Sequence, residues 1–147
     1  MVQLSQDMID AVLEKGRMYE VGGAVRDRLL AGQPAAHDLD FLVTGIGYDD
    51  LSQILRRFGQ VNLVGRSFGV IKYTEYREGQ PATFDISLPR TEYSTGVGHK
   101  EFEVRYDPTL PVEADLVRRD FTINAMAIEL GSDRLIDPLG GREDLQR

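Results

Sequence analysis

The first part of the chain alternates predicted helices with short predicted strands. Residues 5–15 have the spacing of an amphipathic helix, because four apolar residues fall on one face and Ser5 can cap its N-terminus. Gly16 ends this helix. The pattern then predicts strands at residues 19–21 and 39–43, a helix at residues 24–30, and a helix that begins at Asp49 or Asp50 and is closed by Gly59.

Strands dominate the middle of the chain. Residues 60–64 and 68–73 are candidate strands, and residues 82–88 alternate most clearly between apolar and polar. The polar residues 75–81 predict a hairpin turn, and residues 91–100, which show no periodicity, predict a mobile loop. In the clearest strand the residues of one face are apolar and those of the other face polar: Phe84, Ile86 and Leu88 against Thr83, Asp85 and Ser87.

The last part of the chain predicts short elements. Residues 113–118 have the pattern of a helix, and the apolar residues 121–130 that of a helical turn followed by a strand. Leu135-Ile136 is a short strand that can pair with it, and Gly140-Gly141 opens a polar helix. In chain order, these elements predict a mixed α/β domain with one sheet and helices packed beside it.

The composition limits the kinds of site that the chain can hold. The 147 residues fit one domain, and none is cysteine, which excludes disulfides and thiolate metal sites. With His37 and His99 as the only histidines, we expect no zinc site, and oxygen ligands favour magnesium or manganese. No apolar run approaches the length of a membrane span and the N-terminus is not a secretory signal, so we expect a cytoplasmic protein.

The net charge is unusual for a protein that binds nucleic acid. It is formally -7, whereas a domain that grips nucleic acid by itself is usually basic. Either nucleic acid is not the partner, or the basic surface lies elsewhere.

Three aspartates are candidate metal ligands. Asp38 and Asp40 alternate at the start of a predicted strand, so their carboxylates point to one face and repel each other unless one protonates or a cation lies between them. Asp85, on the polar face of another strand, would complete an oxygen-ligand site for two magnesium ions. The simpler interpretation is that the pair is solvated at a strand start and that Asp85 lies on a half-exposed sheet.

Gly22-Gly23 lies between a predicted strand and a predicted helix. Glycine lets the backbone approach a ligand closely, and the free amide groups of the helix that follows suit a phosphate. Arg26, one turn into that helix, is placed to reach an anionic oxygen. The alternative is a tight turn that needs glycine for steric reasons alone.

The segment Arg118–Ala127 is dense in polar groups just before an apolar stretch. Its arginines can fork onto a phosphate, Asp120 can accept a hydrogen bond from a ribose hydroxyl, and Asn124 can both donate and accept. A salt-bridged helix start with Asp120 as its N-cap explains the same residues equally well.

Three segments together resemble the catalytic head of the class II tRNA nucleotidyltransferases and poly(A) polymerases: VGGAVRDRLL, HDLDFLV and RRDFTINAMA. FDISLPRTEYSTGVGH is similar to the third-carboxylate strand of that family and the flexible loop after it. IDPLGGREDL resembles the segment that leads into the neck. The likeness runs from about Tyr19 to Arg147, and its motifs stand in the order that the family has.

The resemblance implies the nucleotidyltransferase fold of the polymerase-β type, with a mixed sheet of about five strands flanked by helices. It implies that Asp38 and Asp40 hold the catalytic metals, Mg²⁺ or Mn²⁺, with Asp85 as the third carboxylate. The implied reaction transfers AMP or CMP from ATP or CTP to the 3′-hydroxyl of an RNA, with tRNA as the expected acceptor, and releases pyrophosphate.

The resemblance also assigns nucleotide contacts. Gly22, Gly23 and Arg26 would bind the triphosphate of the incoming nucleotide. The sugar and phosphate region would meet Arg119 and Asp120, with Asn124 in support. The loop at residues 90–99 would move during nucleotide selection.

One match to a family motif is rejected. EDLQR at residues 143–147 fits the base-reading string E-D-x-x-R, but it directly follows Asp137-Pro138-Leu139-Gly140-Gly141, where the family has its link to the neck. We therefore expect the base-reading residues and the helical neck, body and tail to be absent, and the chain to be a fragment with little activity alone. Because relatives grip RNA largely with those helical parts, an acidic head is then unsurprising.

Other functions stay open at this point. A poly(A) polymerase shares most of these motifs, although LPRTEYSTGVGH is closer to the tRNA-type loop. A nucleotide-binding module without catalysis would carry the same residues. A small-molecule nucleotidyltransferase of the antibiotic-modifying kind is the third alternative, and RRDFTINAMA argues against it by resemblance.

Overall fold

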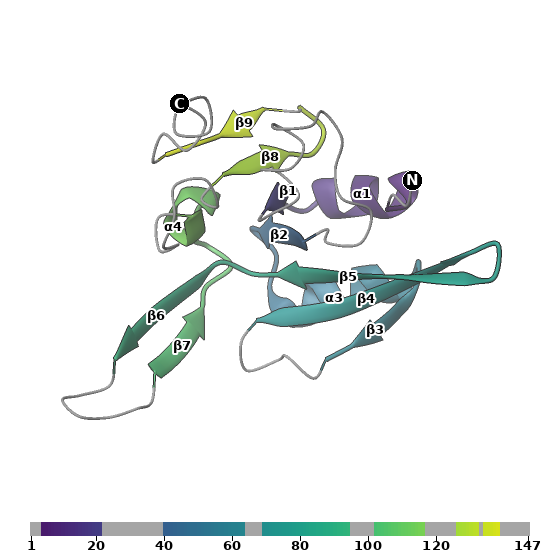
Figure 1. Ribbon diagram of the computed structural model, residues 1–147, viewed down its shortest axis with the longest axis horizontal. Helices are drawn as coiled ribbons and strands as arrows, with labels where there is room; N and C mark the ends of the chain where they lie inside the picture. The colour runs from purple at the N-terminus through teal and green to yellow at the C-terminus, as the bar shows by residue number, and fades with distance from the viewer. Residues whose placement is uncertain are drawn as a thin grey trace, which may run out of the picture.

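A computed structural model gives the arrangement of the helices and strands (Figure 1). It describes residues 4–21, 40–63, 69–94, 102–116, 126–132 and 134–138. In chain order the elements are α1 (Gln6–Leu13), β1 (Arg17–Val21), β2 (Asp40–Thr44), α3 (Tyr48–Arg56), β3 (Gln60–Asn62), β4 (Val70–Arg77), β5 (Gln80–Ser87), β6 (Arg90–Ser94), β7 (Phe102–Tyr106), α4 (Val112–Leu116), β8 (Ala127–Glu129) and β9 (Leu135–Ile136). The helices predicted at residues 24–30 and after Gly140 lie outside the described residues.

Seven strands form one mixed sheet in the order β3-β4-β5-β2-β1-β8-β9. Strands β2 and β5 run parallel, and the other neighbouring pairs of this sheet run antiparallel. The predicted mixed sheet with helices beside it is therefore confirmed. The count of about five strands that the resemblance implies is too low. The strands that the hydropathy pattern predicts at residues 60–64 and Leu135-Ile136 are present as the edge strands β3 and β9.

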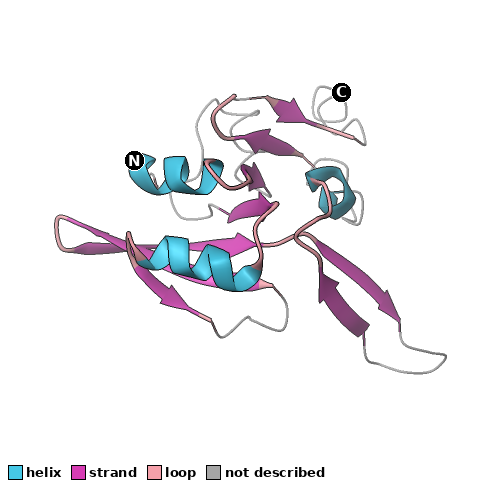
Figure 2. Ribbon diagram, turned by 180° about the vertical axis from the view of Figure 1, so that it is seen from behind, coloured by secondary structure: helices cyan, strands magenta, loops and turns pink. Residues whose placement is uncertain are grey.

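Helices α1 and α3 pack against one face of the sheet, and Figure 2 shows α3 in front of β4 and β5. Helix α1 begins as predicted, because the Ser5 hydroxyl accepts a hydrogen bond from the Met8 amide at 3.3 Å. Met8 and Leu51 are fully buried in this interface. The sheet contributes alternate apolar residues of β2, β4 and β5: Phe41, Val43, Ile71, Tyr73, Phe84 and Ile86.

Among the described residues, apolar packing covers only part of the opposite face of the sheet. Val112 and Leu116 of α4 form a second buried cluster with residues of β1, β2, β8 and β9: Tyr19, Val21, Leu42, Ala127 and Ile136. On β4 and β5 the same face instead carries polar side chains: Lys72, Thr74, Thr83 and Asp85. In the part of the chain that the structure describes, none of the helices has the length and apolar composition needed to cross a membrane.

Strands β4 and β5 form a longer hairpin than the sequence predicts. The polar residues assigned to a turn at 75–81 mostly continue the two strands, and the turn itself is Glu78-Gly79. Both residues have positive φ, 52° and 79°, as a two-residue type I′ hairpin turn requires. The pairing of Arg77 with Gln80 fixes the register of the whole hairpin.

Strands β6 and β7 form a separate two-stranded sheet that projects away from the main sheet (Figure 1). The predicted loop at residues 91–100 is therefore wrong for Thr91–Ser94, which pair with Phe102–Arg105. Residues 95–101 lie outside the described part of the chain. Strand β6, RTEYS, is mostly polar and shows no alternation, so its sequence indicates a loop, whereas β7, FEVRY, alternates between apolar and polar residues.

Candidate active site

Asp40 and Asp85 come together on neighbouring strands. Asp40 is the first residue of β2, Asp85 lies near the end of β5, and the two residues are direct partners in the parallel pairing. Neighbouring strands are about 4.8 Å apart, and paired residues share a face of the sheet. Asp40 is exposed and the Asp85 side chain is 42% exposed, so both carboxylates meet solvent.

Lys72 lies beside this pair and was not singled out from the sequence. It is the cross-strand partner of Asp85 on β4, and its Nζ donates to Asp85 Oδ1 at 2.9 Å. That hydrogen bond, followed by the negative charges of Asp85 and Asp40, raises the pKa of the Lys72 ammonium above its ordinary value. An ion pair this exposed stabilises a fold by at most about 1 kcal/mol, so the contact matters mainly for the chemistry of the carboxylates.

A continuous row of paired residues crosses the sheet at this level. Asp40 is also the partner of Val21 at the end of β1, and Val21 is the partner of Ala127 at the start of β8. In the other direction Lys72 pairs with Asn62 on β3. From edge to interior the row is Asn62, Lys72, Asp85, Asp40, Val21 and Ala127.

Most of the other predicted site residues lie outside the described part of the chain. These are Gly22, Gly23, Arg26, Asp38, Arg119, Asp120 and Asn124. Among the residues that the structure describes, no group of three or more Asp, Glu, His or Cys side chains could hold a metal ion. Of the three predicted metal ligands, the structure thus brings together Asp40 and Asp85, and the place of Asp38 stays a prediction.

Two buried carboxylates in the described residues have structural partners. Glu75 accepts hydrogen bonds from the Ser5 amide at 3.1 and 3.2 Å and from the Tyr73 hydroxyl at 2.6 Å, which ties the start of α1 to β4. Asp115 on α4 is fully buried and accepts from the Arg90 amide at 3.0 Å, which ties α4 to the start of β6. Neither lies in the row that contains Asp40 and Asp85.

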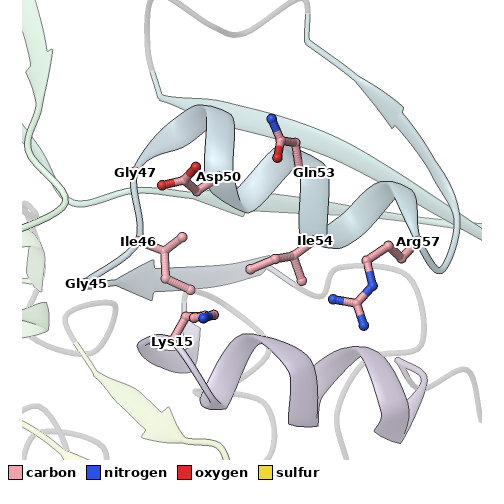
Figure 3. A pocket seen from close by; sticks show the side chains of 8 residues that line it. All are labelled: Lys15, Gly45, Ile46, Gly47, Asp50, Gln53, Ile54 and Arg57. Atoms are coloured by element: carbon pink, nitrogen blue, oxygen red, sulfur yellow. The ribbon is translucent and has the colours of Figure 1, made fainter.

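A polar groove lies on the helix-covered side of the sheet, away from the carboxylate pair. Its volume is about 500 Å³, and Figure 3 shows Lys15 at the end of α1 facing residues of the β2–α3 connection and of α3. Asp50 and Gln53 of α3 and Arg57, the residue after this helix, also line the groove, and Arg57 extends toward α1. Of the predicted site residues that the structure describes, neither Asp40 nor Asp85 lines this groove.

The chain is similar to known proteins over most of its length. Residues 18–147 match the family described as Poly A polymerase head domain. A Multifunctional CCA protein from Paracidovorax citrulli (strain AAC00-1) is 46% identical over 134 residues, which cover 88% of this chain and 29% of that protein. This chain spans only 28% or 29% of the length of the curated relatives that it matches.

Solved structures of the same kind share the fold. A CCA-adding enzyme in an apo form has a TM-score of 0.71 and 29% identity, covering 97% of this chain and 34% of that one. A tRNA nucleotidyltransferase complexed with a primer tRNA and an incoming ATP analog has a TM-score of 0.65 and 30% identity, covering 95% of this chain and 36% of that one. The predicted nucleotidyltransferase fold is therefore confirmed, and with the family match over residues 18–147 the chain belongs to the family of poly(A) polymerase head domains.

Proposed function

We propose that the chain is the catalytic head of an RNA 3′-end nucleotidyltransferase. It transfers AMP or CMP from ATP or CTP to the 3′-hydroxyl of tRNA, adding all or part of CCA, and releases pyrophosphate. A relative is a Multifunctional CCA protein, and a similar solved structure holds a primer tRNA and an ATP analog. Because the chain spans less than a third of its curated relatives, RNA-gripping and base-reading parts are assigned to sequence outside it.

The observation that carries this proposal is the row of paired residues through Asp85, Asp40, Val21 and Ala127. Gly22 is bonded to Val21, and Asp38 precedes Asp40 by two residues. Asn124 precedes Ala127 by three. The segments that carry the phosphate, metal and sugar contacts thus all join the sheet at one level, beside the carboxylate pair.

Asp40 and Asp85 fit a divalent metal. Both are solvent-facing carboxylates on adjacent strands, and hard cations such as Mg²⁺ and Mn²⁺ prefer oxygen ligands. Asp38 would complete the ligand set. Bound there, the cation supplies the positive charge that activates an attacking hydroxyl and stabilises the leaving pyrophosphate.

The remaining residues of the site would bind the nucleotide. Gly22 and Gly23 offer backbone amides to the triphosphate and Arg26 adds a fork of N–H donors. Arg119 and Asp120 contact the sugar and phosphate region, and Asn124 supports them by hydrogen bonding.

The test is a double substitution with a matched control. Asp40→Asn/Asp85→Asn removes two negative charges at the pair, and Asp49→Asn/Asp50→Asn removes two in the first turn of α3. The assay uses the product of the whole gene that contains this sequence. It measures transfer of labelled AMP and CMP to tRNA that lacks its CCA end. We expect the first variant to lose at least about a thousandfold in rate, since metal stabilisation is worth several kcal/mol, and the control to keep its rate.

The same assay separates the other functions. A poly(A) polymerase is favoured by the family description and would make long poly(A) products on any RNA from ATP alone. A nucleotide-binding module would bind MgATP or MgCTP, as titration detects, and transfer nothing. If the Asp40→Asn/Asp85→Asn variant retains full transfer, the site is misplaced.

A further inference from the structure

A second polar groove adjoins the carboxylate pair and has no assigned role. It runs from the end of α3 over the edge strand β3 to β4, and its volume is about 630 Å³. Arg56 and Lys72 both line it, and the Nζ of Lys72 contacts Asp85. The groove therefore reaches the lysine that borders the proposed site of transfer.

Two cationic side chains line the groove although the chain as a whole carries a net charge of -7, and one of them, Lys72, is paired with Asp85. Among the described residues that line it, Arg56 and Lys72 are charged and none is acidic. The amide side chains of Gln60 and Asn62 and the Thr74 hydroxyl add neutral polar groups. Arginine, lysine, amide and hydroxyl side chains are the usual partners of phosphate oxygens in nucleic-acid complexes.

The register of the strands places these groups in a line that leads to the carboxylates. Asn62 pairs with Lys72, which pairs with Asp85, which pairs with Asp40. Three strand spacings separate Asn62 from Asp40, which is about 14 Å. A strand of RNA laid along this line would bring its end to the carboxylate pair.

We propose that this groove binds the phosphate backbone of the acceptor RNA strand next to its 3′ end. The proposal rests on the proposed function, because the RNA is the acceptor of that transfer. In an in-line transfer the attacking and leaving oxygens lie on opposite sides of the phosphorus. The segment proposed to bind the triphosphate continues from Val21 on the β1 side of the pair, and the groove lies on the β4 side, so the two proposed partners would approach the pair from opposite sides.

The first test compares two neighbouring arginines. Arg56 lines this groove, whereas Arg57, at the same end of α3, lines the groove on the helix-covered side (Figure 3). Arg56→Gln and Arg57→Gln therefore make the same charge change on opposite sides of the helix end. Binding of a fluorescent single-stranded RNA with a free 3′-hydroxyl is measured as a function of salt.

We expect Arg56→Gln to weaken RNA binding and to reduce the slope of log K against log salt by about 0.7, the value for one phosphate contact on a single strand. Arg57→Gln should keep the wild-type slope. MgATP and MgCTP binding should stay unchanged in both variants. Equal slopes in the two variants, or a loss of nucleotide binding in Arg56→Gln, would overturn the proposal.

A second test places the RNA directly. The chain has no cysteine, so a single introduced thiol can carry a photoreactive label without competition. Gln60→Cys labels this groove and Gln53→Cys labels the one on the helix-covered side. We expect RNA to cross-link to the label at position 60 through nucleotides near its 3′ end, and equal cross-linking at position 53 would contradict the groove assignment.

The outcomes separate this proposal from the proposed function. If Asp40→Asn/Asp85→Asn abolishes transfer while Arg56→Gln behaves as Arg57→Gln, the transferase stands and the groove assignment fails. If Arg56→Gln weakens RNA binding while the aspartate variant retains transfer, the chain binds RNA in the groove and the assigned transfer site fails.

Discussion

The two faces of the β2–β5 pair differ in chemistry: alternate residues of the same strands form the apolar core on one face and carry carboxylates on the other. On the helix-covered face the rings of Phe41 and Phe84 meet edge to face, with centroids 5.9 Å apart in the core. On the other face, one residue along each strand, Asp40 and Asp85 lie side by side in solvent. The apolar face fixes the register in which the polar face holds its carboxylates.

This difference shows how the chain specifies a site without burying it. A slip of one residue in either strand would turn the carboxylate of that strand toward the core and its ring toward solvent, so the apolar packing strongly selects one register. Substitutions on the two faces should therefore have separate effects. Changes to the covered face should lower stability, and changes to the open face should alter chemistry.

The largest expected effect on stability comes from the covered face. Phe84→Ala removes a ring that is 4% exposed and should lower the free energy of unfolding by about 3–5 kcal/mol. Its neighbour Thr83 points to the open face and hydrogen-bonds Thr74 at 2.9 Å, so Thr83→Ala should cost about 1 kcal/mol or less. Urea unfolding followed by circular dichroism measures both, and a comparable cost for the two variants would contradict the two-face description.

A smaller effect is expected at Lys72 on the open face. Two unit charges about 4 Å apart interact by about 1 kcal/mol in water, and Lys72 competes with any cation at Asp85. Lys72→Gln should therefore tighten Mn²⁺ binding by at least about fivefold, as measured by electron paramagnetic resonance. Lys15→Gln, which removes the same charge in the groove on the helix-covered side, is the control and should leave Mn²⁺ affinity unchanged.

A different result at Lys72 would also be informative. If Lys72→Gln binds Mn²⁺ more weakly than the wild type, the lysine orients Asp85 for the metal rather than competing with it. The Lys72 ammonium would then be a positioning group of the open face that supports metal binding.

Much of the local structure follows from the sequence. The capped start of α1 and the alternation of Phe84, Asp85 and Ile86 on β5 are set by neighbouring residues, and the structure matches both. The two-stranded sheet of β6 and β7 was not predicted, because β6, RTEYS, is mostly polar and shows no alternation to match that of β7, FEVRY. The order of strands in the sheet, with β2 between β5 and β1, depends on contacts between distant segments.

For the candidate site, too, contacts between segments that are distant in the sequence could be predicted only in part. Spacing alone could not unite residues 45 positions apart; the resemblance implied that Asp40 and Asp85 share a site, and their pairing on adjacent strands fits that expectation. Lys72 was missed because the turn was placed over residues 75–81. Glu78-Gly79, read as a two-residue turn, pairs residues outward from Arg77 and Gln80 and would have put Lys72 opposite Asp85.

The smallest expected effect concerns a carboxylate on the same face as Asp40 but at the far side of the sheet. Glu129 accepts from the Ser132 hydroxyl at 2.6 Å, and its carboxylate oxygens lie 3.4 Å from Arg17 Nη1 and 3.9 Å from Arg134 Nε. The hydrogen bond from Ser132, aided by the two arginines, holds the pKa of Glu129 below its ordinary value. Glu129 thus has three neighbouring partners, whereas the only side-chain partner of Asp85 among the described residues is Lys72.

The sign of the pH dependence follows from that lowered pKa. Ionised Glu129 stabilises the fold above its unfolded pKa of about 4.3, and the stabilisation is lost as the pH falls through the lower folded pKa. Glu129→Gln should therefore lower the free energy of unfolding by at most about 1 kcal/mol at neutral pH, because both arginines are largely exposed. The gap to the wild type should close as urea unfolding is repeated below about pH 4, while Mn²⁺ affinity at neutral pH stays at the wild-type value. A gap that persists in acid would mean that Glu129 acts through packing, and a change in Mn²⁺ affinity would mean that the carboxylate pair is coupled to the far side of the sheet.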